Sequence, residues 1–177
     1  MNQLSKASWA QVHFNADFVC IETASGYRSD RIDPKGARHL LSPEVSDEDF
    51  GVALLDAMAR SRFVLGEPRE GIWIHPDTEF DMDFYDPKKT EARYEDWQRS
   101  LMNRYGYKSK KALFKGMKNC LVERRDALIK LTPMHHESLE GWGRTKGDGI
   151  ENVEIAADST PAEVGAALRL ALGRCTE

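Results

Sequence analysis

Alternation and apolar runs near the N-terminus predict two β-strands. Residues 12–14 alternate between apolar and polar side chains, and residues 18–21 form a short apolar run. The intervening Asn15-Ala16-Asp17 favours a turn, so residues 9–25 are predicted to form a strand pair. Residues 26–43 contain two glycines and two prolines, which indicates turns and one short strand.

Three segments carry the start signals of amphipathic helices. Ser46 precedes a first turn of acids, and apolar residues four apart predict a helix that ends near residue 61. Asp86-Pro87 supplies an N-cap and a first helical proline, and Gly106 is the expected stop nineteen residues later. Thr160-Pro161, with a glutamate at the third helical position, predicts a last helix whose apolar stripe faces a core.

Shorter elements fill the regions between these helices. Ser109 is a cap for a short helix predicted through Met117, and residues 72–74 are a strand candidate. Residues 119–132 are predicted to form a hairpin that turns at Arg125-Asp126, and residues 153–155 a further strand. Strands separated by helices, with at least one hairpin, predict an α+β fold: a mixed or antiparallel sheet with helices packed on it. A length of 177 residues predicts a single domain over residues 1–177.

Composition narrows the class of protein. The longest apolar runs are far too short to cross a membrane, and the N-terminus lacks the apolar stretch of a secretory signal. Cys20, Cys120 and Cys175 have no metal-like spacing and are interpreted as reduced thiols. These features predict a soluble, cytoplasmic protein that binds no membrane.

Charge is segregated along the chain, although the net charge is only −4. Residues 44–56 and 77–86 each carry five acids and no base, whereas residues 108–130 carry eight bases against two acids. The candidate partner-binding residues come from the two acidic segments: Asp47, Glu48, Asp49, Asp77, Glu79, Asp81, Asp83 and Asp86.

Strict alternation at residues 77–84 suggests three alternative roles for the second acidic segment. If the segment is extended, its acids line one face, about 6.5–7 Å apart, and its apolar residues line the other. A row of acids can dock a basic partner, because such a field speeds encounter and adds specificity. It can also be an acidic edge that discourages aggregation. A metal site is the third alternative, although carboxylates spread along a strand do not converge on an ion.

Other candidate sites have plainer interpretations. The basic segment Lys108–Lys118, with aromatic residues interleaved, could hold phosphates, but such a segment is more often a solvated helix face. His135-His136 and Cys120 lack the partners that zinc binding or nucleophilic catalysis would need nearby in sequence. No phosphate loop, serine elbow or zinc-protease helix is present. We therefore predict no catalytic residue, cofactor or metal, and a role in binding rather than catalysis.

The second half of the chain resembles a bacterial family, the contact-dependent growth inhibition (CDI) immunity proteins. The similar stretches lie between residues 84 and 175: Arg93–Trp97, Arg104–Met117, Thr132–Glu137 and Ala157–Leu172. The first 80 residues are assigned only by continuity with that half. The aromatic and apolar residues of these stretches are interpreted as shared core, so no toxin-contact residue is transferred from the resemblance.

The resemblance implies a function. CDI immunity proteins stay in the cytoplasm and bind the C-terminal toxin domain that a neighbouring bacterium delivers. Many of these toxins are nucleases, and a nuclease that grips phosphates is basic, so an acidic inhibitor surface would fit it. The resemblance thus predicts a monomer that neutralises a basic nuclease toxin by stoichiometric binding, with no direct contact to nucleic acid. The alternatives are an RNA-binding or RNA-processing protein that uses Lys108–Lys118, and an enzyme whose site is assembled from distant residues.

Overall fold

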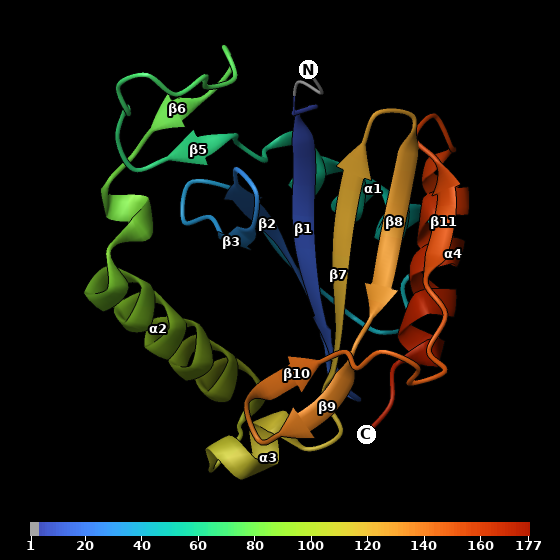
Figure 1. The fold of residues 1–177 in the computed structure, drawn as a ribbon. Helices are drawn as coiled ribbons and strands as arrows, with labels where there is room; N and C mark the ends of the chain where they lie inside the picture. The colour runs from blue at the N-terminus through green and yellow to red at the C-terminus, as the bar shows by residue number, and fades with distance from the viewer. Residues whose placement is uncertain (1–3) are drawn as a thin grey trace.

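A computed structural model describes residues 4–177, and its centre is a seven-stranded antiparallel sheet (Figure 1). The strand order is β11-β8-β7-β1-β2-β3, and β4 also pairs with β2. The strands are β1 (Ala7–Phe14), β2 (Val19–Gly26), β3 (Asp30–Ile32), β4 (Arg38–Leu41), β7 (Lys118–Arg125), β8 (Leu128–Pro133) and β11 (Val153–Ala156). The prediction of an α+β fold with helices on an antiparallel sheet is confirmed.

Local turn chemistry explains the two long hairpins. Between β1 and β2, the Asn15 side-chain oxygen accepts the backbone N–H groups of Asp17 and Phe18 at 2.9 and 3.1 Å. Between β7 and β8, Asp126 adopts a positive φ of 53°, a conformation that aspartate tolerates better than most residues. Both predicted strand pairs are confirmed. The range 26–43 holds two strands, β3 and β4, where one was expected.

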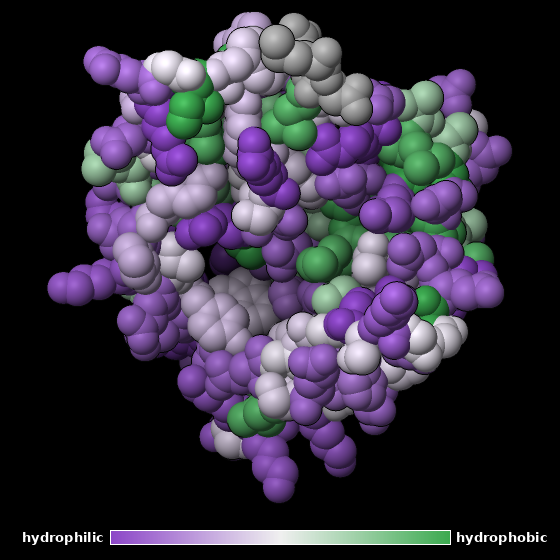
Figure 2. All heavy atoms as spheres, in the orientation of Figure 1, coloured by the Kyte–Doolittle hydropathy of each residue, from purple (hydrophilic) through white to green (hydrophobic). Residues whose placement is uncertain are grey.

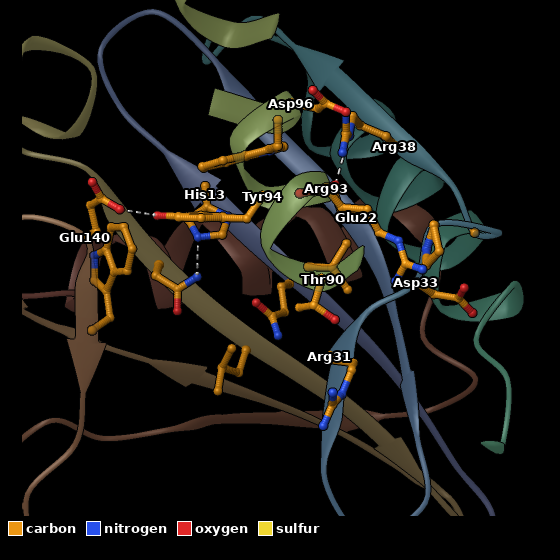
Figure 3. Close-up of a pocket in the computed structure, with 18 of the residues that line it drawn as sticks. His13, Glu22, Arg31, Asp33, Arg38, Thr90, Arg93, Tyr94, Asp96 and Glu140 are labelled. Carbon is orange, nitrogen blue, oxygen red and sulfur yellow. Dashed lines mark hydrogen bonds and ion pairs between the residues drawn. The ribbon is translucent and has the colours of Figure 1, made fainter. Parts of the chain in front are cut away.

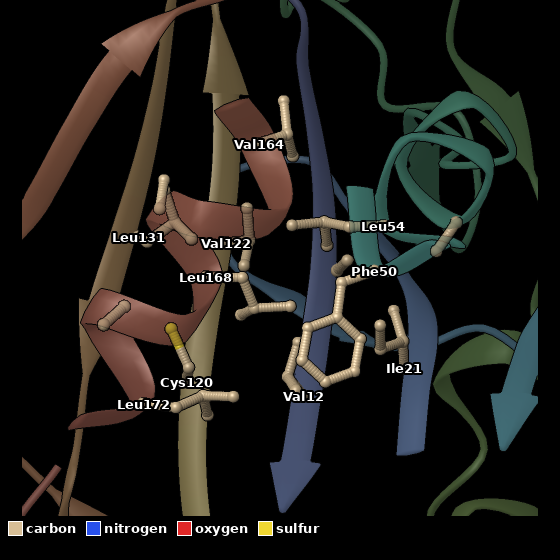
Figure 4. Packing of buried hydrophobic residues seen from close by; sticks show 14 of the residues in the cluster. Val12, Ile21, Phe50, Leu54, Cys120, Val122, Leu131, Val164, Leu168 and Leu172 are labelled. Atoms are coloured by element: carbon tan, nitrogen blue, oxygen red, sulfur yellow. The ribbon is translucent and has the colours of Figure 1, made fainter. Parts of the chain in front are cut away.

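One face of the sheet is covered by α1 (Asp47–Ala59) and α4 (Pro161–Arg174); we call it the closed face. Its core is built from alternate strand residues, because successive side chains of a strand point to opposite sides. Val12, Ile21 and Val122 from the sheet meet Phe50 and Leu168 from the two helices, and all five are at most 1% exposed (Figure 4). Both helices start at their predicted caps, and α4 carries the predicted capping box.

The two helices on the closed face touch through glycines. A Cβ on Gly51 would lie 1.7 Å from the carbonyl oxygen of Pro161, and a Cβ on Gly165 would lie 1.6 Å from that of Asp47. Neither position has room for any side chain, so each helix fits its backbone against the other at one crossing. The crossing joins segments more than one hundred residues apart in sequence.

The opposite face, which we call the open face, is only partly covered. Its elements are α2 (Pro87–Tyr105), α3 (Lys110–Phe114), β9 (His135–Ser138) and β10 (Gly141–Gly143). Trp97 and Leu101 of α2 pack with Leu113 and Phe114 of α3 in a second core cluster. Gly106 ends α2 with a φ of 74°, as predicted. Figure 1 shows α2 standing off from the sheet. None of the helices between residues 4 and 177 is long and apolar enough to cross a bilayer.

The segment between α1 and α2 contains little regular structure. The parallel strands β5 (Val64–Leu65) and β6 (Glu79–Phe80) form a separate two-stranded sheet, and the 3-10 helix η1 (Asp83–Tyr85) leads into α2. The strand predicted at residues 72–74 is wrong, because these residues form an irregular loop in which Ile72 and Trp73 are exposed. The short helix after Ser109 begins as predicted but ends at Phe114, three residues early.

Candidate functional site

A cleft of about 820 Å³ lies on the open face, between the sheet and α2. Figure 2 shows it as a hollow in the middle of the visible face of the molecule. It combines aromatic walls with converging polar groups. These are the usual properties of a binding site in a folded protein.

The floor of the cleft is the open face of three adjacent strands. Gln11 and His13 of β1, Glu22 of β2, and Asn119 and Leu121 of β7 all line it. They alternate with the apolar residues that build the closed-face core, so one strand pattern supplies both surfaces.

His13 lies in the floor between two aromatic rings, although Glu22 and Asn119, 3% and 4% exposed, are more fully buried. Its ring lies 4.9 Å from that of Trp97 and 5.2 Å from that of Trp142, measured between centroids. Burial lowers the pKa of His13 to about 4, so the ring is neutral at physiological pH. Its Nε2 lies 3.2 Å from Nδ2 of Asn119, while Nδ1 has no hydrogen-bond partner among the described residues.

Glu22 and Arg38 form a charged pair at the edge of the floor. The two side chains lie 2.8 Å apart, with the Glu22 side chain only 4% exposed and the Arg38 side chain 43% exposed (Figure 3). Burial raises the pKa of Glu22, and the adjacent guanidinium of Arg38 opposes that effect. The pair therefore places one buried and one accessible charge at the mouth of the cleft.

Two further arginines line the cleft without a carboxylate partner among the described residues. The Arg31 guanidinium lies 4.6 Å from the centroid of the Tyr85 ring, a cation–π contact. Arg93 of α2 donates to the backbone carbonyl of Asp83 at 2.9 Å. Both therefore retain charge that can meet an incoming group.

Glu140 joins α2 and α3 at the lower wall of the cleft. Its carboxylate accepts from the Tyr94 hydroxyl at 3.1 Å and from Gln98 at 3.2 Å, and it pairs with Lys110 at 3.3 Å. Figure 3 shows the Tyr94–Glu140 contact beside His13. Burial raises the pKa of Tyr94 to about 12, so its hydroxyl remains a hydrogen-bond donor. The contact fixes α2 relative to β9 and β10.

The second acidic segment adjoins the cleft but is not one extended strand. Only Glu79–Phe80 is a strand, because Asp81 accepts the backbone N–H of Phe84 at 3.2 Å and starts η1. The predicted alternation of acidic and core-facing sides is therefore wrong. Phe80 and Met82 are exposed, and only Phe84 is buried.

Each acid of this segment has a partner within the chain. Asp77 pairs with Lys6 at 3.4 Å, Asp83 pairs with Lys89 at 2.6 Å, and Asp86 caps α2 through the N–H of Lys89. These contacts reduce the bare charge that sequence alone suggests.

Arg62 holds the remaining two acids of the segment against the sheet edge. It bonds to Asp33 at 2.6 Å, to Glu79 at 3.0 Å and to Asp81 at 3.3 Å. Lys35 also bonds Asp81 at 2.9 Å and lowers the pKa of that carboxyl, with further help from Arg62. Because Asp33 lines the cleft, this network fixes the acidic segment at its rim.

The first acidic segment lies on the other side of the sheet. Asp47, Glu48 and Asp49 form the first turn of α1, where acids favour the helix dipole, and Asp47 pairs with Arg169 of α4 at 2.5 Å. The two acidic segments therefore lie on opposite sides of the sheet and do not form one surface.

The basic segment Lys108–Lys118 spans α3 and the start of β7. Its apolar members Leu113 and Phe114 are fully buried, and Lys118 lies over the Phe14 ring. All three cysteines are buried free thiols. Among residues 4–177, no group of three or more His, Cys, Asp or Glu side chains could hold a metal ion.

The cleft residues escape sequence reasoning because they are spread over seven elements and the loops between them. Gln11, His13 and Glu22 alternate with core residues, a pattern typical of a solvent-facing side of a sheet. Only the position of α2, which begins more than sixty residues later, turns that side into a cleft. Within α2, Arg93 and Tyr94 belong to a stretch that carries the family resemblance, and nothing in that stretch indicates that both residues line a cleft.

The fold and the cleft place the chain among α+β proteins that cover one sheet face with helices and keep a polar cleft on the other. The particular family follows from the sequence: residues 8–175 match the CDI immunity protein family, and the chain belongs to it. It is 51% identical over 175 residues to the immunity protein CdiI-YPIII of Yersinia pseudotuberculosis serotype O:3, with 99% of each chain covered.

Two solved structures share the fold over nearly the whole chain. A chain from the CdiA-CT/CdiI toxin and immunity complex of Yersinia pseudotuberculosis has a TM-score of 0.93 at 50% identity, with 98% of this chain and 99% of that chain covered. A protein of unknown function from Neisseria meningitidis has a TM-score of 0.81 at 32% identity, with 99% of both chains covered. The resemblance stated from residues 84–175 is confirmed, and it extends through the first half of the chain.

Proposed function

We propose that this chain neutralises the C-terminal toxin domain of a CdiA protein by stoichiometric binding inside the cell that makes it. The observation that carries this proposal is the full-length likeness to the Yersinia pseudotuberculosis structure, which is a complex of toxin and immunity protein. The chain acts by occupying a surface of the toxin rather than by changing it chemically, and it meets the toxin as a monomer.

The cleft is the part of the surface best suited to hold the toxin. A concave site needs a convex partner, so a projecting segment of the toxin domain would enter between α2 and the sheet. The aromatic side of the cleft, at Tyr94 and Trp142, supplies apolar contact, while Arg31 and Arg93 supply charge at its mouth. The Tyr94 side chain is already held by its hydrogen bond to Glu140, which limits the ordering cost of binding at that wall.

The acidic residues Asp77, Glu79, Asp81, Asp83 and Asp86 serve in this proposal as a rim that steers a basic nuclease toward the cleft. Acidic side chains at a rim act mainly on the association rate, because their field acts before contact. Asp47, Glu48 and Asp49 are too far round the sheet to share the role, since they lie with α1 on the closed face.

The first test is a matched pair of charge reversals on α2. Arg93 lines the cleft, whereas Arg104 lies on the same helix outside it and is exposed. Arg93→Glu should raise the dissociation constant for the cognate CdiA C-terminal domain at least tenfold, about 1.4 kcal/mol. Arg104→Glu should leave it unchanged. Calorimetry measures both, and rescue of growth from the co-expressed toxin checks the function itself.

The possible outcomes distinguish an error in the proposed function from an error in the proposed contact surface. If the wild-type chain neither binds nor protects, the proposed function is wrong. If it protects, but Arg93→Glu binds as tightly as the wild type, the cleft is not the contact surface.

The second test addresses the acidic rim. Reversing Asp77 and Asp83 to lysine leaves the Arg62 network intact and should slow association about tenfold at low salt. The control reverses Glu48 and Asp49 on the closed face, which changes the net charge equally. Stopped-flow association rates at two salt concentrations compare the variants. Equal rates for both pairs would show that net charge, and not the rim, steers the encounter.

A further inference from the structure

The segment that runs from the loop at residues 72–74 into the acidic rim exposes four large apolar side chains. Ile72, Trp73, Phe80 and Met82 are 58%, 51%, 46% and 67% exposed, and they fall within eleven residues. They are four of the nine large hydrophobic side chains exposed in the described structure. Scattered apolar residues on a surface are ordinary, but a concentration of this kind marks an interaction site. We refer to these four residues as the apolar patch.

The backbone that carries the apolar patch is fixed by polar contacts. The N–H of His75 donates to the Tyr27 hydroxyl at 3.0 Å, and the His75 ring lies 5.2 Å from that of Phe63, which is buried. The N–H groups of Glu79 and Asp81 donate to the carbonyls of Phe63 and Leu65 at 2.8 and 2.9 Å. The apolar side chains thus project from an anchored loop, and their binding would need little further ordering.

The charges around the apolar patch favour a basic partner. Residues 66–86 contain seven carboxylates and one arginine. Four cations from outside the segment, Lys6, Lys35, Arg62 and Lys89, pair with its acids, so carboxylates still outnumber cations. Since each paired acid already has a cation, electrostatics alone gives this surface modest affinity.

We propose that the apolar patch is a second contact surface for the toxin domain, with Trp73 as its main anchor and the surrounding acids as its specificity rim. This inference rests on the proposed function. Interfaces place aromatic residues and methionine at their centre and polar residues around them, and tryptophan is enriched among the side chains that dominate binding energy.

The position of the apolar patch connects it to the cleft. The same segment continues through Asp81 and Asp83 to α2, and Arg62 links it to Asp33 in the cleft lining. Figure 1 shows this segment projecting beyond the upper end of α2. In this proposal, a toxin domain seated over the cleft extends past its rim to the apolar patch, so that one partner covers both surfaces.

The test replaces exposed apolar side chains on the two faces of the molecule. Trp73→Ser and Met82→Ser remove members of the apolar patch, while Val52→Ser and Leu170→Ser are matched controls on α1 and α4, 52% and 50% exposed. The probe is the cognate CdiA C-terminal domain, titrated against the full-length protein. Trp73→Ser should raise the dissociation constant at least tenfold, mainly through faster dissociation, and Met82→Ser about threefold.

The controls and the salt dependence make the result decisive. Val52→Ser and Leu170→Ser should bind as the wild type does, and the Trp73→Ser effect should persist at high salt because apolar contact is not screened. If Trp73→Ser binds within twofold of the wild type while Arg93→Glu binds weakly, the apolar patch is no contact surface and the proposed function stands. If the wild-type chain fails to bind at all, the proposed function fails, and this inference fails with it.

Discussion

The two faces of the sheet are built from the same strands but meet different requirements. The closed face packs aliphatic and aromatic side chains from β1, β2, β7 and β8 against α1 and α4, with backbone contact at Gly51 and Gly165. The open face carries a glutamate, a histidine and an asparagine under a helix that covers it only in part. Packing on the closed face stabilises the fold. This stabilisation offsets the free energy lost by burying polar groups on the open face.

The free-energy cost of burying polar groups on the open face comes from individual side chains. His13 is held neutral by burial and leaves Nδ1 without a partner among the described residues, which is unfavourable compared with hydration. Glu22 is 3% exposed and depends on Arg38 as its only ion-pair partner in the described structure. A protein selected for stability alone would place apolar residues at these positions, so the polar floor indicates a surface kept for binding.

The largest expected effect comes from the closed face. Leu168→Ala deletes a fully buried side chain between α4 and the sheet and should lower the free energy of unfolding by about 2–5 kcal/mol. Affinity for the toxin domain should not change when measured on folded protein well below the melting temperature. Urea unfolding and calorimetry give the two quantities. A large loss of affinity without loss of structure would contradict the assignment of stability to the closed face and of binding to the open face.

A pH-dependent effect is expected from the open face. The pKa of His13 is about 4 when folded and near 6.5 when unfolded, so between these values only the unfolded state binds the proton. The contribution of His13 to stability is therefore complete above pH 6.5 and declines as pH falls, by about 3 kcal/mol at pH 4. His13→Gln should flatten unfolding free energies between pH 4 and 6.5, whereas His135→Gln should not. An unchanged slope in His13→Gln would show that folding does not lower the pKa of His13.

The smallest expected effects concern the helix caps on each face. Thr160 caps α4 and Asp86 caps α2, each through a side-chain oxygen that accepts a backbone N–H. Replacing either by alanine should cost about 1 kcal/mol. Because α4 is packed along its length and α2 is not, Asp86→Ala should speed amide hydrogen exchange in the first turns of α2 more than Thr160→Ala does in α4. The reverse order would mean that α2 is the better anchored helix.

The elements that sequence predicts well are those with complete local signals. Caps and stops at Ser46, Asp86, Gly106 and Thr160 locate three helices to within a residue or two, and the turn at Arg125-Asp126 locates the main hairpin. The failures lie in residues 66–84. There, alternating side chains suggest a strand. The backbone instead adopts a conformation fixed by hydrogen bonds to Phe63, Leu65 and Tyr27, which are distant in sequence and therefore invisible to a local pattern.

The candidate sites show the same limit. Acidic runs are visible in sequence, but their neutralising partners Lys6, Lys35 and Arg62 are brought in by the fold, and so is the separation of Asp47 from Asp77 onto different faces. The cleft depends on how α2 sits above three strands, a long-range arrangement that no local pattern encodes. The family resemblance, by contrast, is carried by short core motifs and can therefore be recognised from the sequence alone.

The crossing of α1 and α4 at Gly51 and Gly165 has a consequence for synthesis on the ribosome. Helix α1 is made early, but the partner that completes its core follows more than one hundred residues later. At about 5–20 residues per second, the nascent chain waits several seconds or longer for that partner. The central pairing of β1 with β7 imposes a similar delay. The core of the closed face is therefore complete only after α4 has been synthesised, and until then the apolar side of α1 stays without its partner helix.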